Sequence, residues 1–460
     1  MRGVLIDASR LVEQHRYYFE LVGVLASWGL DTLLFHFSDD HGLSVSLPGF
    51  EELAAPHALS ALEVRELVAH GQQHGVRIIP ELECFGHTRY LAKHPRYGPC
   101  FIGDPGSDVI EFSAVDPTSE ETKELMRGLL AAVDNCFGSE IIHIGCDEVN
   151  LGPFCKQRGI EDSSALWSGY VNGLIGAVQD LGRRPMLWAD HLVKDPRIRA
   201  AVDKSAIAVD WQYSPDAGDA GLAALKVAGF SDVVVAPAAS CWTTRCHGHR
   251  DNLDNIAMMT RHAARHGAAG LLNTVWHPYR HLQRAMYHAL AFGALQLQSD
   301  GELAGTALDV KMAEALFESD DGRVLRLCAE LGLVQCAYGH LEAAMGDSVL
   351  NQKQRAMAER SVQVGTALLA GTEGVTVPKH QDWWDVMRLS ARTAVHCCRL
   401  ALVPGALRQP EVAREHVALA AELEADWDAT RFSDDPAKTT PRWRNEAGQY
   451  LLAAMRSLHF

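Results

Sequence analysis

Residues 141–149 read IIHIGCDEV, an apolar run that ends in two adjacent acids, Asp147 and Glu148. A continuous apolar run of this length is typical of a β-strand that is buried on both faces. Successive side chains of a strand point to opposite faces, so two adjacent acids can face one substrate only where the strand turns into its loop. We therefore expect a strand over residues 141–146 that is followed by a turn carrying both acids.

Seven further segments of the first 300 residues share this apolar character, and amphipathic stretches separate them. The predicted strands cover residues 4–7, 32–37, 77–82, 141–146, 184–189, 206–211, 232–236 and 269–275. The predicted helices between them cover residues 12–28, 61–74, 119–137, 163–181 and 252–266, and Ser60, Thr118 and Ser163 are the expected N-caps. Eight alternating units of this kind predict a (β/α)8 TIM barrel over residues 1–300.

The pattern changes after about residue 300, where helical periodicity replaces the strand pattern. The predicted helices there cover residues 310–318, 325–345, 353–369, 384–402 and 410–423. We expect a separate all-helical C-terminal domain over residues 301–460. Our hypothesis is that this domain covers one side of the barrel or mediates formation of a homodimer.

The composition excludes several classes of protein. The 460 residues include 42 Lys and Arg against 58 Asp and Glu, a net charge of −16, which argues against a nucleic-acid partner because phosphate grooves need a basic surface. No apolar run approaches the roughly 20 residues of a membrane helix, and Asp7 interrupts any secretory signal. The eleven cysteines show no CxxC spacing, so we expect reduced thiols, a cytoplasmic location, and no metal or cofactor.

The predicted strands end in polar side chains, and a barrel of this kind places its active site at the C-terminal ends of its strands. Acidic, histidine and arginine side chains at these ends are Asp7, Arg10, His36, Asp39, Asp40, His41, Glu81, Glu83, His87, Asp147, Glu148 and Asp190. Tryptophans lie at or after four other strands, as Trp188, Trp211, Trp242 and Trp276. Indole rings stack on sugar faces and carboxylates bind hydroxyls, so the set favours a carbohydrate pocket.

Two neighbouring carboxylates should also push one pKa upward, which is what a general acid needs near neutral pH.

Four motifs follow one another at the strand ends, and together they resemble a known family. They are Arg2-Gly3, residues 35–40 (FHFSDD), residues 81–88 (ELECFGHT) and residues 143–148 (HIGCDE). In this order they resemble glycoside hydrolase family 20, the β-N-acetylhexosaminidases, over about residues 1–295. The wording of residues 143–149 and the start of the chain at the first barrel strand are most similar to the hexosaminidase D type.

The resemblance implies exo-acting, retaining hydrolysis of a β-linked N-acetylhexosaminide, assisted by the substrate's own acetamide. Glu148 would protonate the glycosidic oxygen, and Asp147 would orient the acetamide. The remaining implied contacts are Arg2 to the sugar's O3 and O4, Asp39 and His87 around the acid, and a cage built by Trp188, Trp211 and Trp276.

The sequence departs from the family pattern at three places. Glu83 stands where an aspartate is usual, residues 238–242 (AASCW) replace the usual Tyr-Leu-Asp, and residues 276–278 (WHP) replace Trp-x-Glu. Tyr213 is a candidate for the missing tyrosine, and Trp242 is a candidate pocket wall.

These departures keep alternatives open: a sugar-binding homologue with altered catalysis, or a glycosidase with a different hexosamine specificity. A metal-dependent barrel hydrolase is a further alternative, although the expected His-x-His after the first strand reads Asp7-Ala8-Ser9.

Overall fold

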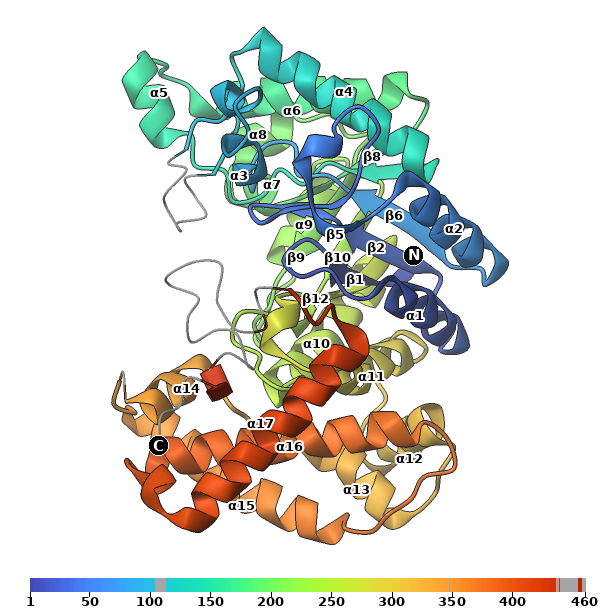
Figure 1. The fold of residues 1–460 in the computed structure, drawn as a ribbon. Helices are drawn as coiled ribbons and strands as arrows, with labels where there is room; N and C mark the ends of the chain where they lie inside the picture. The colour runs from blue at the N-terminus through green and yellow to red at the C-terminus, as the bar shows by residue number, and fades with distance from the viewer. Residues whose placement is uncertain (104–112, 347, 436–437, 439–453, 457–460) are drawn as a thin grey trace. The chain divides into compact units, whose positions relative to one another are not determined.

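A closed sheet of parallel strands forms the core of the N-terminal part of the chain in the computed structural model, which describes residues 1–103, 113–346, 348–435, 438 and 454–456. The barrel strands are β1 (Arg2–Asp7), β2 (Thr32–His36), β6 (Arg77–Glu81), β7 (Ile141–His143), β8 (Arg184–Trp188), β9 (Ile207–Trp211), β10 (Val233–Ala236) and β12 (Gly270–Val275). They pair in that order, and β12 also pairs with β1 (Figure 1). The predicted barrel and its eight strands are confirmed, although β7 ends at His143, three residues before the predicted end at residue 146.

The register of the strands brings their polar ends to one level. Asp7 of β1 pairs with His36 of β2, His36 pairs with Glu81 of β6, and Glu81 pairs with His143 of β7. Below this level the strands carry buried aliphatic side chains such as Leu34, which are fully withdrawn from solvent. Since parallel strands end at the same edge, this register builds one polar layer at the C-terminal end of the barrel.

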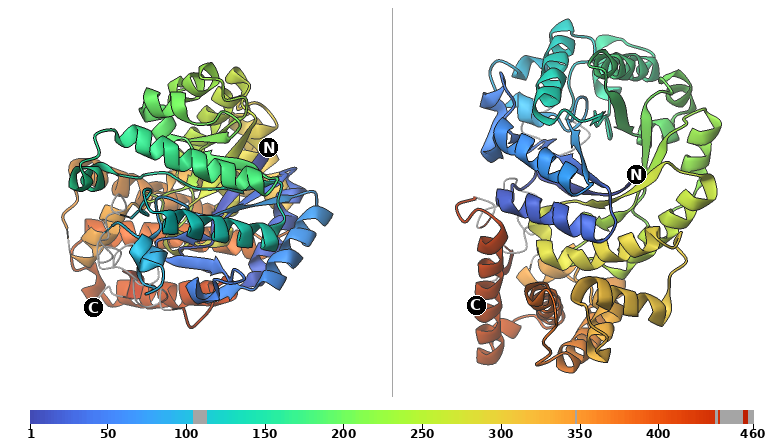
Figure 2. Two further views of the ribbon diagram at one scale, coloured as in Figure 1. Left: turned by 90° about the horizontal axis from the view of Figure 1, so that it is seen from above. Right: turned by 90° about the vertical axis from the view of Figure 1, so that its right-hand side faces the viewer.

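Helices lie outside the barrel strands (Figure 2). The longer ones are α1 (His15–Ser27), α2 (Ala61–Gln73), α4 (Glu120–Phe137), α6 (Ser163–Asp180), α9 (Ala220–Val227) and α10 (Arg250–His266), and the shorter ones are α3 (Arg89–Ala92), α5 (Gly152–Arg158), α7 (Asp190–Lys194) and α8 (Pro196–Ala201). Ser60 caps α2 in a capping box with Glu63, as predicted. The other two predicted caps are wrong by one residue, because the side chains of Ser119 and Asp162 accept the amide hydrogen bonds at α4 and α6.

Short strands that the sequence pattern did not predict follow β2 and β10. A small sheet contains β3 (Ser38–Asp39), β4 (Gly42–Val45) and β5 (Ala54–Leu59), and β11 (Ala238–Ser240) pairs with β12. β3, β4 and β11 have two to four residues, too few for a measurable alternation of apolar and polar side chains, and the six residues of β5 contain Pro56, which argues against a strand. The small sheet matters for the site, because it fixes Asp39 directly after the barrel strand β2.

The described elements that follow β12 are helical, as predicted. They include α11 (Tyr287–Leu297), α12 (Gly305–Phe317), α13 (Gly322–Glu330), α14 (Tyr338–Met345), α15 (Gln352–Gly371), α16 (Gln381–Leu402) and α17 (Pro410–Thr430). The single helix expected over residues 325–345 is wrong, because a 3-10 turn at Leu331–Leu333 separates α13 from α14. Gly332 at this turn lies so close to Leu253 that a Cβ atom there would crowd its side chain.

The chain divides into two compact units. Unit 1 comprises Met1–Gln212, Ala217–Pro237 and Met259–Leu272, and unit 2 comprises Tyr213–Asp216, Ala238–Met258 and Asn273–Phe460. The predicted domain boundary near residue 300 stays a prediction. Across the part of the chain that the structure describes, no helix has the length and apolar character needed to cross a membrane.

Candidate active site

The turn after β7 presents the two acids of the 141–149 segment. The strand ends at His143, and the backbone then adopts positive φ at Gly145 (65°), Cys146 (79°) and Glu148 (52°). Left-handed conformations are costly for residues other than glycine, and they are concentrated at functional sites. This turn breaks the alternation of a strand, so Asp147 and Glu148 can both approach the ring of His87. The expectation that the acids lie where the strand becomes a loop is confirmed.

Two glycines allow the chain to pack tightly around this turn. A Cβ atom at Gly86 would collide with the carbonyl oxygen of Asp147, and one at Gly145 would collide with the carboxylate of Glu83. Gly145 thus leaves the space that the carboxylate of Glu83 occupies.

His87 connects the two acids to the next strand end. Its Nε2 atom lies 3.5 Å from Oε2 of Glu148 and 3.7 Å from Oδ2 of Asp147. Its Nδ1 atom lies 3.6 Å from Oδ2 of Asp39 and 3.9 Å from Oδ2 of Asp40. His87 is 4 % exposed, and its backbone has a φ of 49°. The structure therefore brings four of the predicted site residues together: Asp39, His87, Asp147 and Glu148.

Arg10 supplies a buried guanidinium group beside these residues. Its Nη1 atom lies 2.9 Å from Oδ2 of Asp7, and its Nη2 atom lies 2.8 Å from Oδ2 of Asp39. Nε2 of His36 lies 3.1 Å from the same Asp39 oxygen. Arg10 was visible in the sequence as a strand-end residue, but it was not among the predicted substrate contacts.

The prediction that Arg2 belongs to the site is wrong. Arg2 is the first residue of β1, whereas Asp7 is the last, so Arg2 lies at the opposite end of the barrel from the acids. Its side chain is 52 % exposed and pairs with Asp31, the residue before β2. Arg10, which follows β1 and pairs with Asp39, lies instead at the end where the acids lie.

Glu81 is fully buried at the end of β6, and its carboxylate lies within a network of hydrogen bonds and ion pairs. Its carboxylate lies 2.9 Å from Nδ1 of His36 and 3.5 Å from Nδ1 of His143, and it accepts a hydrogen bond of 2.6 Å from Nε1 of Trp188. Trp188 is 1 % exposed, and its ring lies 4.6 Å from that of His143. In this structure, Trp188 holds Glu81 and does not offer an open face for stacking. Trp211, the other predicted cage residue in unit 1, is half-buried at the end of β9.

The two adjacent acids have opposite pKa shifts. Burial raises the pKa of Asp147 to about 7; the charge of His87 opposes this rise, while Glu148 and Asp190 add to it. A hydrogen bond from His87 lowers the pKa of Glu148, whose side chain is 37 % exposed. The predicted upward shift within the pair therefore falls on Asp147. At neutral pH, Asp147 is therefore about half protonated while Glu148 is ionised, so in the ligand-free protein a proton on the pair favours Asp147.

The surrounding groups explain why His87 stays charged. Burial disfavours its cation, but Asp39 and Asp147 raise the pKa of His87 well above the ordinary value. Arg10 and His87 in turn overcome the effect of burial and hold the pKa of Asp39 well below its usual range. Burial and the charge of Asp147 raise the pKa of Glu83 well above its usual range. The layer thus combines cations, anions and a neutral acid.

Residues after β8 hold the backbone of the acid turn. The amide of Glu148 donates to Oδ2 of Asp190 at 3.4 Å, and the amide of Val149 donates to Nε2 of His191 at 3.1 Å. Lys194 donates to the same Asp190 oxygen at 3.2 Å. These contacts fix the turn independently of its side chains.

The three aromatic residues predicted for the pocket from unit 2 form a cluster of their own. Nε1 of Trp276 donates to Oη of Tyr213 at 2.7 Å, and the rings of Tyr213 and Trp242 lie 5.6 Å apart. Trp242 is 50 % exposed. That these residues contact a sugar stays a prediction.

Several sets of side chains lie close enough to share a metal ion. In unit 1 these are His36 with Glu81 and Glu83, Asp39 with Asp40 and His87, and His87 with Asp147 and Glu148. Each set is part of the ion-pair network described above, so geometry alone does not separate a metal site from a network of acids and imidazoles.

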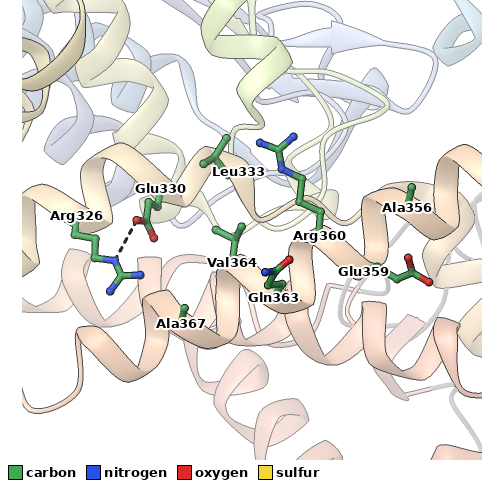
Figure 3. A pocket seen from close by; sticks show the side chains of 9 residues that line it. All are labelled: Arg326, Glu330, Leu333, Ala356, Glu359, Arg360, Gln363, Val364 and Ala367. Carbon is green, nitrogen blue, oxygen red and sulfur yellow. Dashed lines mark hydrogen bonds and ion pairs between the residues drawn. The ribbon is translucent and has the colours of Figure 1, made fainter.

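A surface pocket in unit 2 lies between α13 and α15 (Figure 3). Its wall includes the ion pair between Arg326 and Glu330, at 3.1 Å, and the side chains of Glu359 and Arg360. These are ordinary features of exposed helix faces, and we assign the pocket no part in the chemistry.

Comparisons with known proteins agree with the barrel and with its strand-end motifs. The chain is 26 % identical over 207 residues to β-hexosaminidase subunit beta of Mus musculus, a match covering 41 % of this chain and 38 % of that protein. It is 24 % identical over 254 residues to the Homo sapiens subunit beta, covering 51 % and 44 %. The chain thus matches less than half the length of these curated relatives.

Solved structures show the same fold. A Flavobacterium johnsoniae chitobiase is similar with a TM-score of 0.54 and 15 % identity, covering 94 % of this chain and 76 % of that one. A Streptomyces plicatus β-hexosaminidase, solved with its product GlcNAc, gives 0.53 and 15 %, covering 68 % and 66 %. The family model for the catalytic domain of glycosyl hydrolase family 20 matches residues 1–274. The chain belongs to glycosyl hydrolase family 20.

Proposed function

We propose that this chain is an exo-acting, retaining β-N-acetylhexosaminidase that removes terminal β-linked GlcNAc or GalNAc. The observation that carries the proposal is the Asp147–Glu148 pair, which the strained turn after β7 brings to one imidazole, His87. The names of the similar proteins, β-hexosaminidase subunits and a β-hexosaminidase with bound GlcNAc, support the same activity. Within the family, the sequence of residues 143–149 (HIGCDEV) supports a hexosaminidase D type.

In the first step, Glu148 donates its proton to the glycosidic oxygen, and the bond from that oxygen to the anomeric carbon breaks. The substrate's acetamide oxygen attacks the anomeric carbon and forms an oxazolinium ion. Asp147, as a carboxylate, accepts a hydrogen bond from the acetamide N–H and stabilises the positive charge that develops there.

This step requires the proton of the pair to be on Glu148, whereas the ligand-free protein favours Asp147. A bound sugar reverses this preference for two physical reasons. It covers the half-exposed Glu148 and so disfavours its ionised form, and its acetamide N–H stabilises the ionised form of Asp147. Where Asp147 is protonated, substrate binding therefore moves that proton to Glu148 without uptake from solvent.

In the second step, a water molecule attacks the anomeric carbon while Glu148, now a carboxylate, takes one of its protons. The bond from the acetamide oxygen to the anomeric carbon breaks, and the sugar leaves with its β configuration retained. Arg10, buried against Asp7 and Asp39, is our candidate for the guanidinium that binds sugar hydroxyls, the role that the sequence assigned to Arg2.

The test compares two chromogenic substrates that differ only in the acetamide, a nitrophenyl N-acetyl-β-glucosaminide and a nitrophenyl β-glucoside. The proposal predicts turnover of the first only, with the β-anomer of the sugar as the initial product by NMR. Equal turnover of both substrates, or an initial α-anomer, contradicts it. Tight calorimetric binding of GlcNAc with no turnover of any β-linked substrate would support a sugar-binding homologue instead.

Two further predictions about this protein remain to be tested. A cytoplasmic location is supported by the eleven cysteines, which are all free thiols and all buried. Formation of a homodimer through the C-terminal helices can be measured by sedimentation of the full chain.

A further inference from the structure

A cluster of metal-ligating side chains lies in unit 2. Cys336 lies two residues before α14, His340 lies in the first turn of α14, and Cys398 lies in the last part of α16. One ligand atom of each of these three residues lies within 4.8 Å of the corresponding atoms of the other two. All three residues have 0 % of their surface exposed.

Two further thiols adjoin this group. The Cys336 thiol interacts with those of Cys246 and Cys397 as well as with Cys398 and His340. Cys246 follows β11, where its backbone bridges to His281, and it is fully buried. Four sulfur atoms and an imidazole thus converge from three segments that lie far apart in the sequence.

A cysteine can be buried without other thiols or an imidazole beside it. A free cysteine behaves as a small apolar side chain, and it packs well against aliphatic neighbours. Other buried cysteines such as Cys136 and Cys328 belong to no ligand group among the described residues. Thiolates and imidazoles are, by contrast, the ligands that thiophilic metals select.

We propose that Cys246, Cys336, His340 and Cys398 bind one Zn²⁺ ion in unit 2. In a tetrahedral site with zinc–sulfur bonds of about 2.3 Å, the sulfur atoms lie about 3.8 Å apart. The ligand atoms of Cys336, His340 and Cys398, which all lie within 4.8 Å of one another, approach this spacing. Cys397 is left outside the ligand set, because its sulfur also lies 3.5 Å from Sδ of Met455.

The surroundings of His340 fit this assignment. Its Nε2 atom lies 2.9 Å from the carbonyl oxygen of Gln354, the kind of contact that fixes the ring of a metal-bound histidine, so Nδ1 is the atom that would bind the metal. The amide of Ala337 donates to Nδ1 at 3.0 Å. Zinc binding replaces that hydrogen bond with a stronger interaction.

The charges also balance. Three thiolates and one Zn²⁺ leave a net charge of 2 − 3 = −1. The buried guanidinium of Arg245, next to Cys246 in the chain, interacts electrostatically with Cys336 and Cys246 and compensates this charge. A bound ion would join the loop after β11, the start of α14 and the end of α16 within unit 2, so we expect a structural role.

The experiment measures zinc in the full-length protein, purified without chelators and dialysed extensively. Elemental analysis should give one zinc per chain, and a thiol-modifying mercurial should release it to a colorimetric zinc indicator. Replacing zinc with Co²⁺ should give thiolate-to-cobalt charge-transfer bands and the visible bands of tetrahedral cobalt. The double variant Cys336→Ser/Cys398→Ser should lose the metal, whereas Cys397→Ser and Cys328→Ser should retain it.

Several results would overturn the proposal. Wild-type protein with negligible zinc and no cobalt–thiolate bands would exclude the site, and so would a disulfide among these cysteines found by mass spectrometry of non-reduced peptides. Zinc retained in the soluble double variant would place the ion elsewhere. Zinc lost in Cys397→Ser but retained in Cys246→Ser would refute the ligand set. If the double variant is insoluble, the cobalt spectrum of the wild-type protein tests the proposal: thiolate-to-cobalt bands support the site, and their absence excludes it.

Discussion

Nε2 of His87 lies 3.5 Å from Oε2 of Glu148, while the other nitrogen of the same ring lies 3.6 Å from Asp39. One buried imidazolium therefore connects the proposed acid to the ion pair between Asp39 and Arg10. The predictions below follow from this arrangement.

Replacing His87 should shift the pH dependence of catalysis to higher pH. Its charge lowers the pKa of both Asp147 and Glu148, so a neutral glutamine in His87→Gln raises both values. We expect kcat/KM to fall by about tenfold or more at neutral pH, and both limbs of its pH profile to move upward. An unchanged profile would show that His87 does not control the pair. His94→Gln, which changes a histidine just after α3 whose ring lies against Tyr97, is a suitable control.

Asp147 should reduce stability as the pH rises. Its folded pKa of about 7 is above the ordinary value of 3.8, so its contribution is fully present below about pH 4 and is lost as the pH rises through 7. Asp147→Asn removes this loss. Thermal unfolding should show a larger advantage of the variant over wild type at pH 8 than at pH 5, by a few degrees, together with loss of activity. Equal differences at both pH values would contradict the raised pKa.

Arg10 and Arg2 should behave differently when each is changed to glutamine. Arg10→Gln removes the guanidinium that pairs with the buried carboxylates of Asp7 and Asp39, and breaking a buried ion pair costs about 3–5 kcal/mol in other proteins. Arg2→Gln removes an exposed pair worth about 1 kcal/mol or less. Urea unfolding should show the large loss only for Arg10→Gln, and kcat/KM should fall only in that variant. A catalytic defect in Arg2→Gln would restore the assignment made from the sequence.

Trp188 should be needed for its N–H group as well as for its ring. Trp188→Phe keeps most of the aromatic volume but removes the donor to Glu81, leaving a buried charged acceptor with one bond fewer. Loss of such a bond costs about 1.5–3 kcal/mol. The free energy of unfolding should fall by this amount. Trp167→Phe, which changes another buried tryptophan outside this network, should show the cost of the altered ring volume alone.

The barrel was predictable because strands that are buried on both faces have continuous apolar sequences. All eight predicted strands occur in the structure. The acids after β7 were predictable for a related reason, since Asp147 and Glu148 directly end such a run. The caps of α4 and α6 were misplaced by one residue because neighbouring Ser, Thr and Asp side chains can all serve as caps.

Other features depend on which residues lie close together in space, and the order of residues along the chain does not show this. Arg2 was assigned to the site from its motif, although its place at the start of β1 already sets it opposite Asp7; strand direction would have favoured Arg10. The burial of Trp188 against Glu81 depends on the register between strands. The thiol cluster has no local spacing, because Cys246, Cys336 and Cys398 come from separate segments.

The most direct test of the proposed function is the leaving-group dependence of Glu148→Gln. A general acid matters most for poor leaving groups, so hydrolysis of N,N′-diacetylchitobiose should fall by roughly 10²–10⁴-fold, and hydrolysis of an activated nitrophenyl glycoside by much less. The exposed Glu161→Gln should retain wild-type rates on both substrates. Near wild-type hydrolysis of the disaccharide by Glu148→Gln would contradict the assignment of Glu148 as the acid.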